Sequence, residues 1–157
     1  MLLSSDIYKK SKRIACYFAT DHEFSLQPII DAIISSNKLC YLPKINNDLL
    51  DFVQHTPDCS LVLNRFNILE PNSEDLISKK DLDLVLVPLV GFDLSGNRLG
   101  MGGGFYDKSF NFLLNKTSKS PFFMGVGFES QQSKEIPTED FDVKLDAVMT
   151  EAKVYYF

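Results

Sequence analysis

The most constraining feature of the chain is a glycine-rich stretch, residues 96–107, which holds five of the eight glycines. It follows an apolar run at residues 84–90 that is typical of a buried strand, and it leads into a helix expected at residues 105–115. Three successive glycines lose backbone entropy without any gain in packing, so a close approach to a ligand is the better explanation. Backbone N–H groups in a turn between strand and helix can point at an anion. With Arg98, Asp107 and Lys108, the stretch predicts a site for a phosphate and a metal ion.

The stretch matches neither of the two standard phosphate loops. A dinucleotide loop needs glycine where Phe105 stands, and a Walker A loop needs glycine where Asp107 stands. A plain tight turn is the structural alternative. In that case Arg98 would pair at the surface with Asp93 or Asp107, and Asp107 would simply be an acid favoured at the start of a helix.

The order of the expected elements indicates an α/β fold. With 157 residues and 45% hydrophobic residues, we expect one domain over residues 1–157. Its architecture is expected to be a three-layer sandwich around a largely parallel sheet, with a small β-hairpin region. Strands are expected at residues 13–19, 39–42, 49–53, 61–66, 83–88, 122–128, 147–150 and 154–157, and helices at 7–12, 28–36 and 105–115.

Local signals give finer expectations. Pro43 should end its strand, and the strands at 49–53 and 61–66 should form a hairpin. Residues 70–73 should be a loop, with Ser73 capping a short helix.

Composition argues against several classes of partner. A formal net charge of −5 disfavours binding to nucleic acid, which needs a basic face. The longest apolar run, near residues 84–92, is interrupted by Pro88 and is too short to span a membrane. Cys16, Cys40 and Cys59 are odd in number and widely spaced, so we expect reduced thiols in a cytoplasmic protein. We also expect a monomer.

The glycine-rich stretch resembles the signature of the 5-formyltetrahydrofolate cyclo-ligases, also called methenyltetrahydrofolate synthetases. It reads Gly96-Asn97-Arg98-Leu99-Gly100-Met101-Gly102-Gly103-Gly104-Phe105-Tyr106-Asp107. Four further segments are similar to the family in the same order along the chain, at residues 68–71, 86–93, 124–128 and 136–151. The resemblance spans roughly residues 8–155.

The resemblance implies a reaction. ATP, with Mg²⁺, would phosphorylate the formyl oxygen of 5-formyltetrahydrofolate, N10 would attack, and 5,10-methenyltetrahydrofolate, ADP and phosphate would result. Such chemistry needs positioning and charge neutralisation rather than a protein nucleophile. The implied catalytic residues are Arg98 and Tyr106. ATP binding falls on Arg98, Leu99, Gly100, Met101, Gly102, Gly103, Gly104, Phe105 and Tyr106.

The resemblance also implies metal and folate contacts. Asp107 and Asp142 would hold Mg²⁺, with Asp146 as the alternative second ligand. Substrate contacts would come from Glu23, Met101 and Phe105. Without the resemblance, Glu23 would be read as a solvated turn residue, and the acids near residue 142 as a solvated cluster.

One departure from the family concerns nucleotide binding. Family members usually begin with a further helical segment whose Lys and Arg reach the nucleotide, whereas this sequence starts almost at the first strand of the family. The lysines and arginine at residues 9–13 are no clear substitute. The alternative function is therefore a non-catalytic folate- or nucleotide-binding protein of the same fold, degenerate at its N-terminus.

Overall fold

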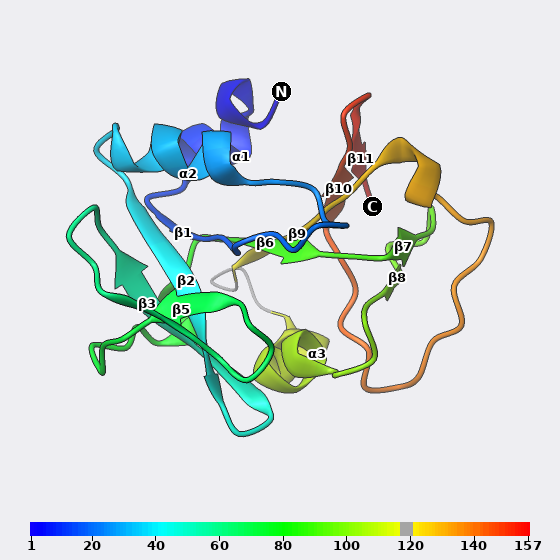
Figure 1. Cartoon of the computed structure of the whole chain (residues 1–157). Coiled ribbons are helices and arrows are strands. Elements are labelled where there is room, and N and C mark those ends of the chain that lie inside the picture. Colours follow the sequence, from blue (N-terminus) through cyan, green and yellow to red (C-terminus); the bar gives the residue numbers. More distant parts are fainter. Residues whose placement is uncertain (117–120) are drawn as a thin grey trace.

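A seven-stranded sheet forms the centre of the protein, in the order β11-β10-β9-β6-β1-β2-β3 (Figure 1). The structure, a computed structural model, describes residues 1–116 and 121–157. The inner strands run parallel, and β3 and β11 are antiparallel strands at the two edges. The strands are β1 Arg13–Ala15, β2 Leu39–Asn46, β3 Leu49–His55, β6 Leu84–Pro88, β9 Phe122–Val126, β10 Ala147–Met149 and β11 Val154–Tyr156.

Helices cover both faces of the sheet, so the expected three-layer α/β sandwich is confirmed (Figure 1). On one face lie α1 (Asp6–Lys10) and α2 (Gln27–Ile34). On the other lie α3 (Phe105–Ser109) and the 3-10 helix η3 (Asn111–Asn115). The remaining 3-10 helices are η1 Leu2–Ser4, η2 Lys79–Asp81 and η4 Glu129–Gln131.

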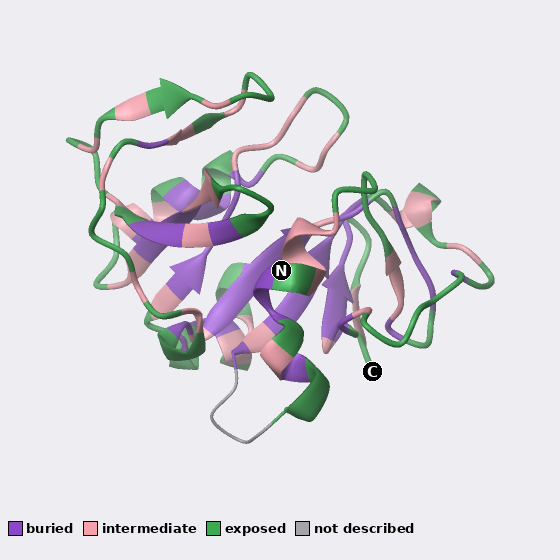
Figure 2. Cartoon of the chain, turned by 90° about the horizontal axis from the view of Figure 1, so that it is seen from below, coloured by how far each residue is buried: buried purple, intermediate pink, exposed green. Residues whose placement is uncertain are grey.

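Strand β6 shows why the sheet is sandwiched. Its alternate residues point to opposite faces: Leu84 and Leu86 join the core under α1 and α2, while Val85 and Val87 join the core under α3. All four are buried, as Figure 2 shows for the central strands. A strand buried on both faces has to be apolar throughout, which is the pattern that predicted it.

Two expected strands differ most from the structure, each by four residues at its end. The strand expected at residues 13–19 is only β1, because the chain leaves the sheet after Ala15. Strand β2 does not end at Pro43; it continues to Asn46, with Pro43 opposite Phe52 of β3. Only residues 39–41 of β2 pair with β1, so the missing N–H of Pro43 is tolerated along an edge that has no partner strand there.

The expected hairpin between residues 49–53 and 61–66 is wrong. Strand β3 pairs with β2, and β4 (Leu61–Leu63) pairs with β5 (Leu69–Pro71). Residues 70 and 71 therefore belong to a strand rather than to a loop. Residues 72–78, all described, contain no helix, and the Ser73 hydroxyl instead accepts a hydrogen bond from the N–H of Asp75 in a turn. Each segment had a nearer partner along the chain than the one expected.

Two further properties follow from the coordinates. None of the helices in residues 1–116 and 121–157 has the length and apolar character needed to cross a membrane. Cys16, Cys40 and Cys59 are free thiols, and the first two are buried.

Candidate active site

The glycine-rich stretch divides into two parts with different roles. A small hairpin of β7 (Gly91–Phe92) and β8 (Arg98–Leu99) separates β6 from the loop, and Gly96 lies in its turn. Only residues 100–104 form the connection from β8 to α3, which we call the glycine loop. The expectation that the whole stretch joins strand to helix is therefore corrected by this hairpin.

The glycine loop exposes unpaired backbone donors. Gly102 and Gly104 have φ of +88° and +63°, a conformation that favours glycine. The N–H groups of residues 100–103 donate to no acceptor within the described chain, and all four residues are exposed. Met101 and Leu99 also project to the surface, with Met101 68% exposed. A loop of this kind can bind an anion through its backbone.

The hydroxyl of Tyr106 is buried without a hydrogen-bond partner in the described structure. The ring stacks on Phe110, with centroids 6.3 Å apart, and contacts Phe123. Burial, followed by the negative charge of Glu23, raises the pKa of Tyr106, and the positive charge of Arg98 opposes this shift. The hydroxyl therefore keeps its proton at neutral pH and is a donor that lacks an acceptor.

Glu23 lies in the segment that follows β1, and its charge acts on the pKa of Tyr106. Its Oε2 accepts hydrogen bonds from the N–H and the hydroxyl of Thr20, at 2.8 and 2.9 Å. Tyr17 fixes the same segment by donating to the carbonyl of Phe24 at 2.9 Å. Burial, Tyr106 and Glu23 all raise the pKa of Tyr17, so the two phenols and the carboxylate share one environment. Tyr17, which was expected in a strand at residues 13–19, lies beyond the end of β1.

Arg98 and Asp107 form an ion pair, with Nη2 and Oδ1 2.6 Å apart. The side chain of Arg98 is only 6% exposed, and its guanidinium lies 5.2 Å from the centre of the Phe123 ring. The pair expected as a surface alternative is thus present but buried. Asp93 is not involved, since it accepts hydrogen bonds within its own turn and from the N–H of Ile136.

The Asp107 carboxylate leaves one oxygen without a protein contact. Both of its donors, Arg98 and the N–H of Val143, bind Oδ1. Within the described residues, no hydrogen bond or ion pair to Oδ2 is present. The Val143 contact also brings Asp107 next to the segment that carries Asp142.

Asp142 and Asp146 differ in how far they are engaged. One oxygen of Asp142 accepts from the N–H of Glu139 at 2.8 Å. Asp146 is bound by the ammonium group of Lys116 and by the N–H of Phe123, both at Oδ2. Asp142 and Arg98 line a groove of about 480 Å³. In the described part of the chain, no three His, Cys, Asp or Glu side chains gather as a metal site.

Comparison with known proteins gives the family. The family described as the 5-formyltetrahydrofolate cyclo-ligase family matches residues 1–151. The chain belongs to this family.

Cyclo-ligases from several organisms are similar over most of the chain. The 5-formyltetrahydrofolate cyclo-ligase of Haemophilus influenzae is 39% identical, covering 87% of this chain and 74% of that protein. That of Escherichia coli K12 is 36% identical, covering 90% and 79%. The solved structure of Aquifex aeolicus 5,10-methenyltetrahydrofolate synthetase matches with a TM-score of 0.81 and 32% identity, over 99% of this chain and 76% of that one. The resemblance inferred from the sequence is confirmed.

The candidate site of this cyclo-ligase family member draws its residues from separate segments of the chain. Arg98 pairs with Asp107, the N–H of Val143 ties Asp107 to the segment of Asp142, and the charges of Glu23 and Arg98 act on the pKa of Tyr106, so three separate segments contribute. These segments are the loop after β1, the β7–β8 hairpin with α3, and the stretch before β10. They meet only in the folded cyclo-ligase chain.

Proposed function

We propose that the chain converts 5-formyltetrahydrofolate and ATP, with Mg²⁺, into 5,10-methenyltetrahydrofolate, ADP and phosphate. The observation that carries the proposal is the hydroxyl of Tyr106, which is buried and unpaired within the described residues, on the helix that directly follows the open N–H groups of the glycine loop. A buried donor without a partner costs stability, so such a group indicates a ligand acceptor.

The residues fit a phosphoryl-transfer reaction that forms no covalent enzyme intermediate. The formyl oxygen attacks the γ-phosphorus and ADP leaves; N10 then attacks the formyl carbon and phosphate leaves with the oxygen. In this scheme the glycine loop holds phosphate oxygens through its N–H groups. Tyr106 donates a hydrogen bond to an oxygen of the reacting group and keeps its proton. Glu23 accepts a hydrogen bond from the folate. Arg98 pairs with Asp107 and orients its carboxylate.

The donor set fits Mg²⁺. Mg²⁺ is commonly held by one or two carboxylates together with phosphate oxygens and water, and Asp107 offers an open Oδ2. Asp142 is the better second ligand, because its carboxylate has one backbone donor whereas Asp146 is neutralised by Lys116. When bound, the ion would neutralise charge on the transferred phosphoryl group.

We also propose a cytoplasmic location, which the three free thiols support. A monomeric state remains a prediction.

An absorbance assay for the methenyl product tests the function. Purified protein with 5-formyltetrahydrofolate should form product only when both ATP and Mg²⁺ are present. A preparation that binds the folate but forms no product at any ATP concentration would instead support the non-catalytic binding protein. That outcome is physically possible because Arg98 is already engaged by Asp107.

A further inference from the structure

The connection between β4 and β5 lies against the glycine loop. The ring of Phe66 meets that of Phe105 edge to face, with centroids 5.9 Å apart. The Phe105 ring in turn lies so close to Gly103 that a Cβ there would be 2.8 Å from the ring. A short segment between two small strands therefore borders the site, although it lies far from the glycine loop in sequence.

Arg65 is held in place within this connection. Its guanidinium carbon is 5.1 Å from the Phe66 ring and 5.9 Å from the Phe105 ring, and Nη2 donates to the carbonyl of Asn47 at 2.6 Å. The turn itself is fixed by Asn64, whose side-chain oxygen accepts from the N–H groups of Phe66 and Ile68. Stacking and a single hydrogen bond orient the guanidinium while leaving most of its five donors open.

Arg65 has no acidic partner. Within the described residues no carboxylate lies within 4.0 Å of it, and the side chain is exposed. The nearby Asp48 is paired with Lys108 at 3.1 Å, and this hydrogen bond and charge lower the pKa of Asp48. The turn between β2 and β3, which carries Asp48, lies beside α3 in Figure 1. The charge of Arg65 also helps to lower the pKa of Asp48, but Arg65 forms no ion pair within the described residues.

We propose that Arg65 binds the glutamate carboxylates of the folate substrate. A planar guanidinium is suited to bind a carboxylate with two parallel hydrogen bonds. The inference rests on the proposed function. It places the folate tail on the aromatic side of the glycine loop, beside Phe66 and Phe105. The phosphate groups of ATP would then bind the backbone N–H groups of the glycine loop, on the side where Asp107 lies.

A cycle of two ligands and two proteins tests the inference. The ligands are 5-formyltetrahydrofolate and 5-formyltetrahydropteroate, which lacks the glutamate. Calorimetric titration without ATP compares the parent chain with Arg65→Gln. We expect Arg65→Gln to weaken folate binding about 10- to 100-fold and to leave pteroate binding unchanged. Arg65→Lys keeps the charge but loses the planar guanidinium. Its affinity for the folate should lie between that of the parent chain and that of Arg65→Gln.

Lys80→Gln is the matched control. Lys80 is also a surface cation over an aromatic ring, with Nζ 5.6 Å from the centre of Phe112, so the change removes the same charge elsewhere. It should leave both affinities unchanged.

Four results would overturn the inference. Equal weakening of both ligands would mean that Arg65 only supports the loop. In a separate titration with ATP, an effect on ATP binding alone would assign Arg65 to phosphate. No effect of Arg65→Gln, with the parent chain still binding folate, would remove the subsite but not the function. If the parent chain binds neither of the two ligands, the proposed function fails and the subsite fails with it.

Discussion

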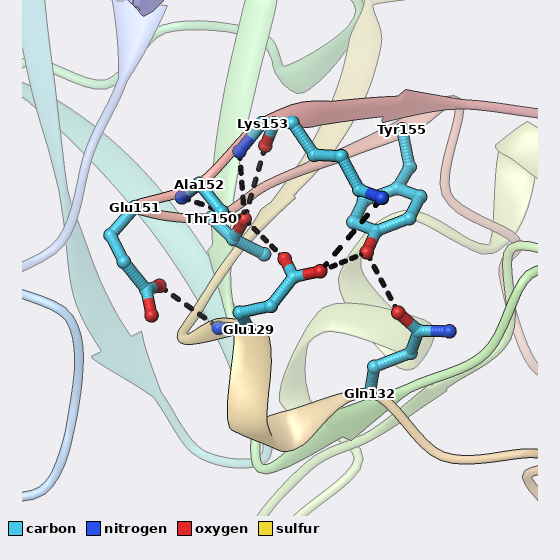
Figure 3. Close-up of polar contacts among 7 residues, drawn as sticks. All are labelled: Glu129, Gln132, Thr150, Glu151, Ala152, Lys153 and Tyr155. Atoms are coloured by element: carbon cyan, nitrogen blue, oxygen red, sulfur yellow. Dashed lines mark hydrogen bonds and ion pairs between the residues drawn. The ribbon is translucent and has the colours of Figure 1, made fainter.

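Two polar regions of the protein are built in opposite ways. In the Glu129 cluster (Glu129, Gln132, Thr150, Glu151, Lys153 and Tyr155), the polar groups satisfy one another (Figure 3). The Thr150 hydroxyl donates to Glu129 at 2.7 Å and accepts from the N–H groups of Ala152 and Lys153. The other carboxylate oxygen of Glu129 accepts from the hydroxyl of Tyr155.

The site around Tyr106 leaves its polar groups open. Among residues 1–116 and 121–157, the Tyr106 hydroxyl, the N–H groups of the glycine loop and one oxygen of Asp107 have no hydrogen-bond partner. The Glu129 cluster ties the turn between β10 and β11 to η4 and requires no ligand. Unsatisfied groups, rather than charged or polar groups as such, therefore separate a binding site from a structural network.

The largest effect is expected where the open oxygen of Asp107 is removed. Asp107→Asn should lower turnover about 10²- to 10³-fold, because a preorganised electrostatic stabiliser is lost. It should also destabilise the fold by about 1.5–3 kcal/mol, because the amide is a weaker partner for the buried Arg98 guanidinium. Turnover at saturating Mg²⁺ and a thermal melt measure the two effects separately.

The neighbouring acids provide its controls. Asp142→Asn should raise the Mg²⁺ concentration needed for activity, whereas Asp146→Asn should leave that requirement unchanged. If Asp107→Asn keeps parental turnover and the parental Mg²⁺ dependence, Asp107 is only the counter-ion of Arg98.

A matched pair of hydroxyl deletions should have smaller effects on stability and turnover. Thr150→Val removes a buried, paired hydroxyl and should lower the free energy of unfolding by about 1 kcal/mol without changing turnover. Tyr106→Phe removes a buried, unpaired one and should leave stability unchanged or raise it by about 1 kcal/mol, while turnover falls. Urea unfolding and steady-state kinetics on both variants measure the contrast. A loss of stability in Tyr106→Phe would show that its hydroxyl is paired in the free protein.

The smallest expected effect is a pH dependence of stability that comes from His55. Its Nδ1 is the other buried side-chain polar atom without a hydrogen-bond partner in the described chain. Burial lowers the pKa of His55, so the unfolded chain takes up a proton before the folded one does. Stability should therefore be complete above the unfolded pKa of about 6.5 and fall as the pH drops below it. The slope should not exceed about 1.4 kcal/mol per pH unit.

Urea unfolding between pH 8 and pH 5 measures this slope. The variant His55→Leu should lack this contribution, so the difference between the two curves isolates it from the carboxylates. Identical curves would mean that the imidazole finds an acceptor when it is charged.

The fold is most predictable from the sequence where the residues of an element are buried without interruption. Strand β6 was predictable because both of its faces are covered, which leaves an apolar run. Helix α2 was predictable from its buried stripe of Ile29, Ile30 and Ile33. Strand ends and hairpin partners were not predictable, because they depend on which neighbours lie alongside, as Pro43 shows.

The sequence by itself determined the family, the three-layer α/β class and the chemistry available in residues 96–107, since these depend on residue types and their order. Only the tertiary structure decided which groups are satisfied. It paired Arg98 with Asp107, enclosed the Tyr106 hydroxyl near Glu23, and set Arg65 against Phe105. Hydrogen bonds and charges act over a few ångströms in space, and residues 36 positions apart, such as Asp107 and Val143, come that close only after the chain folds.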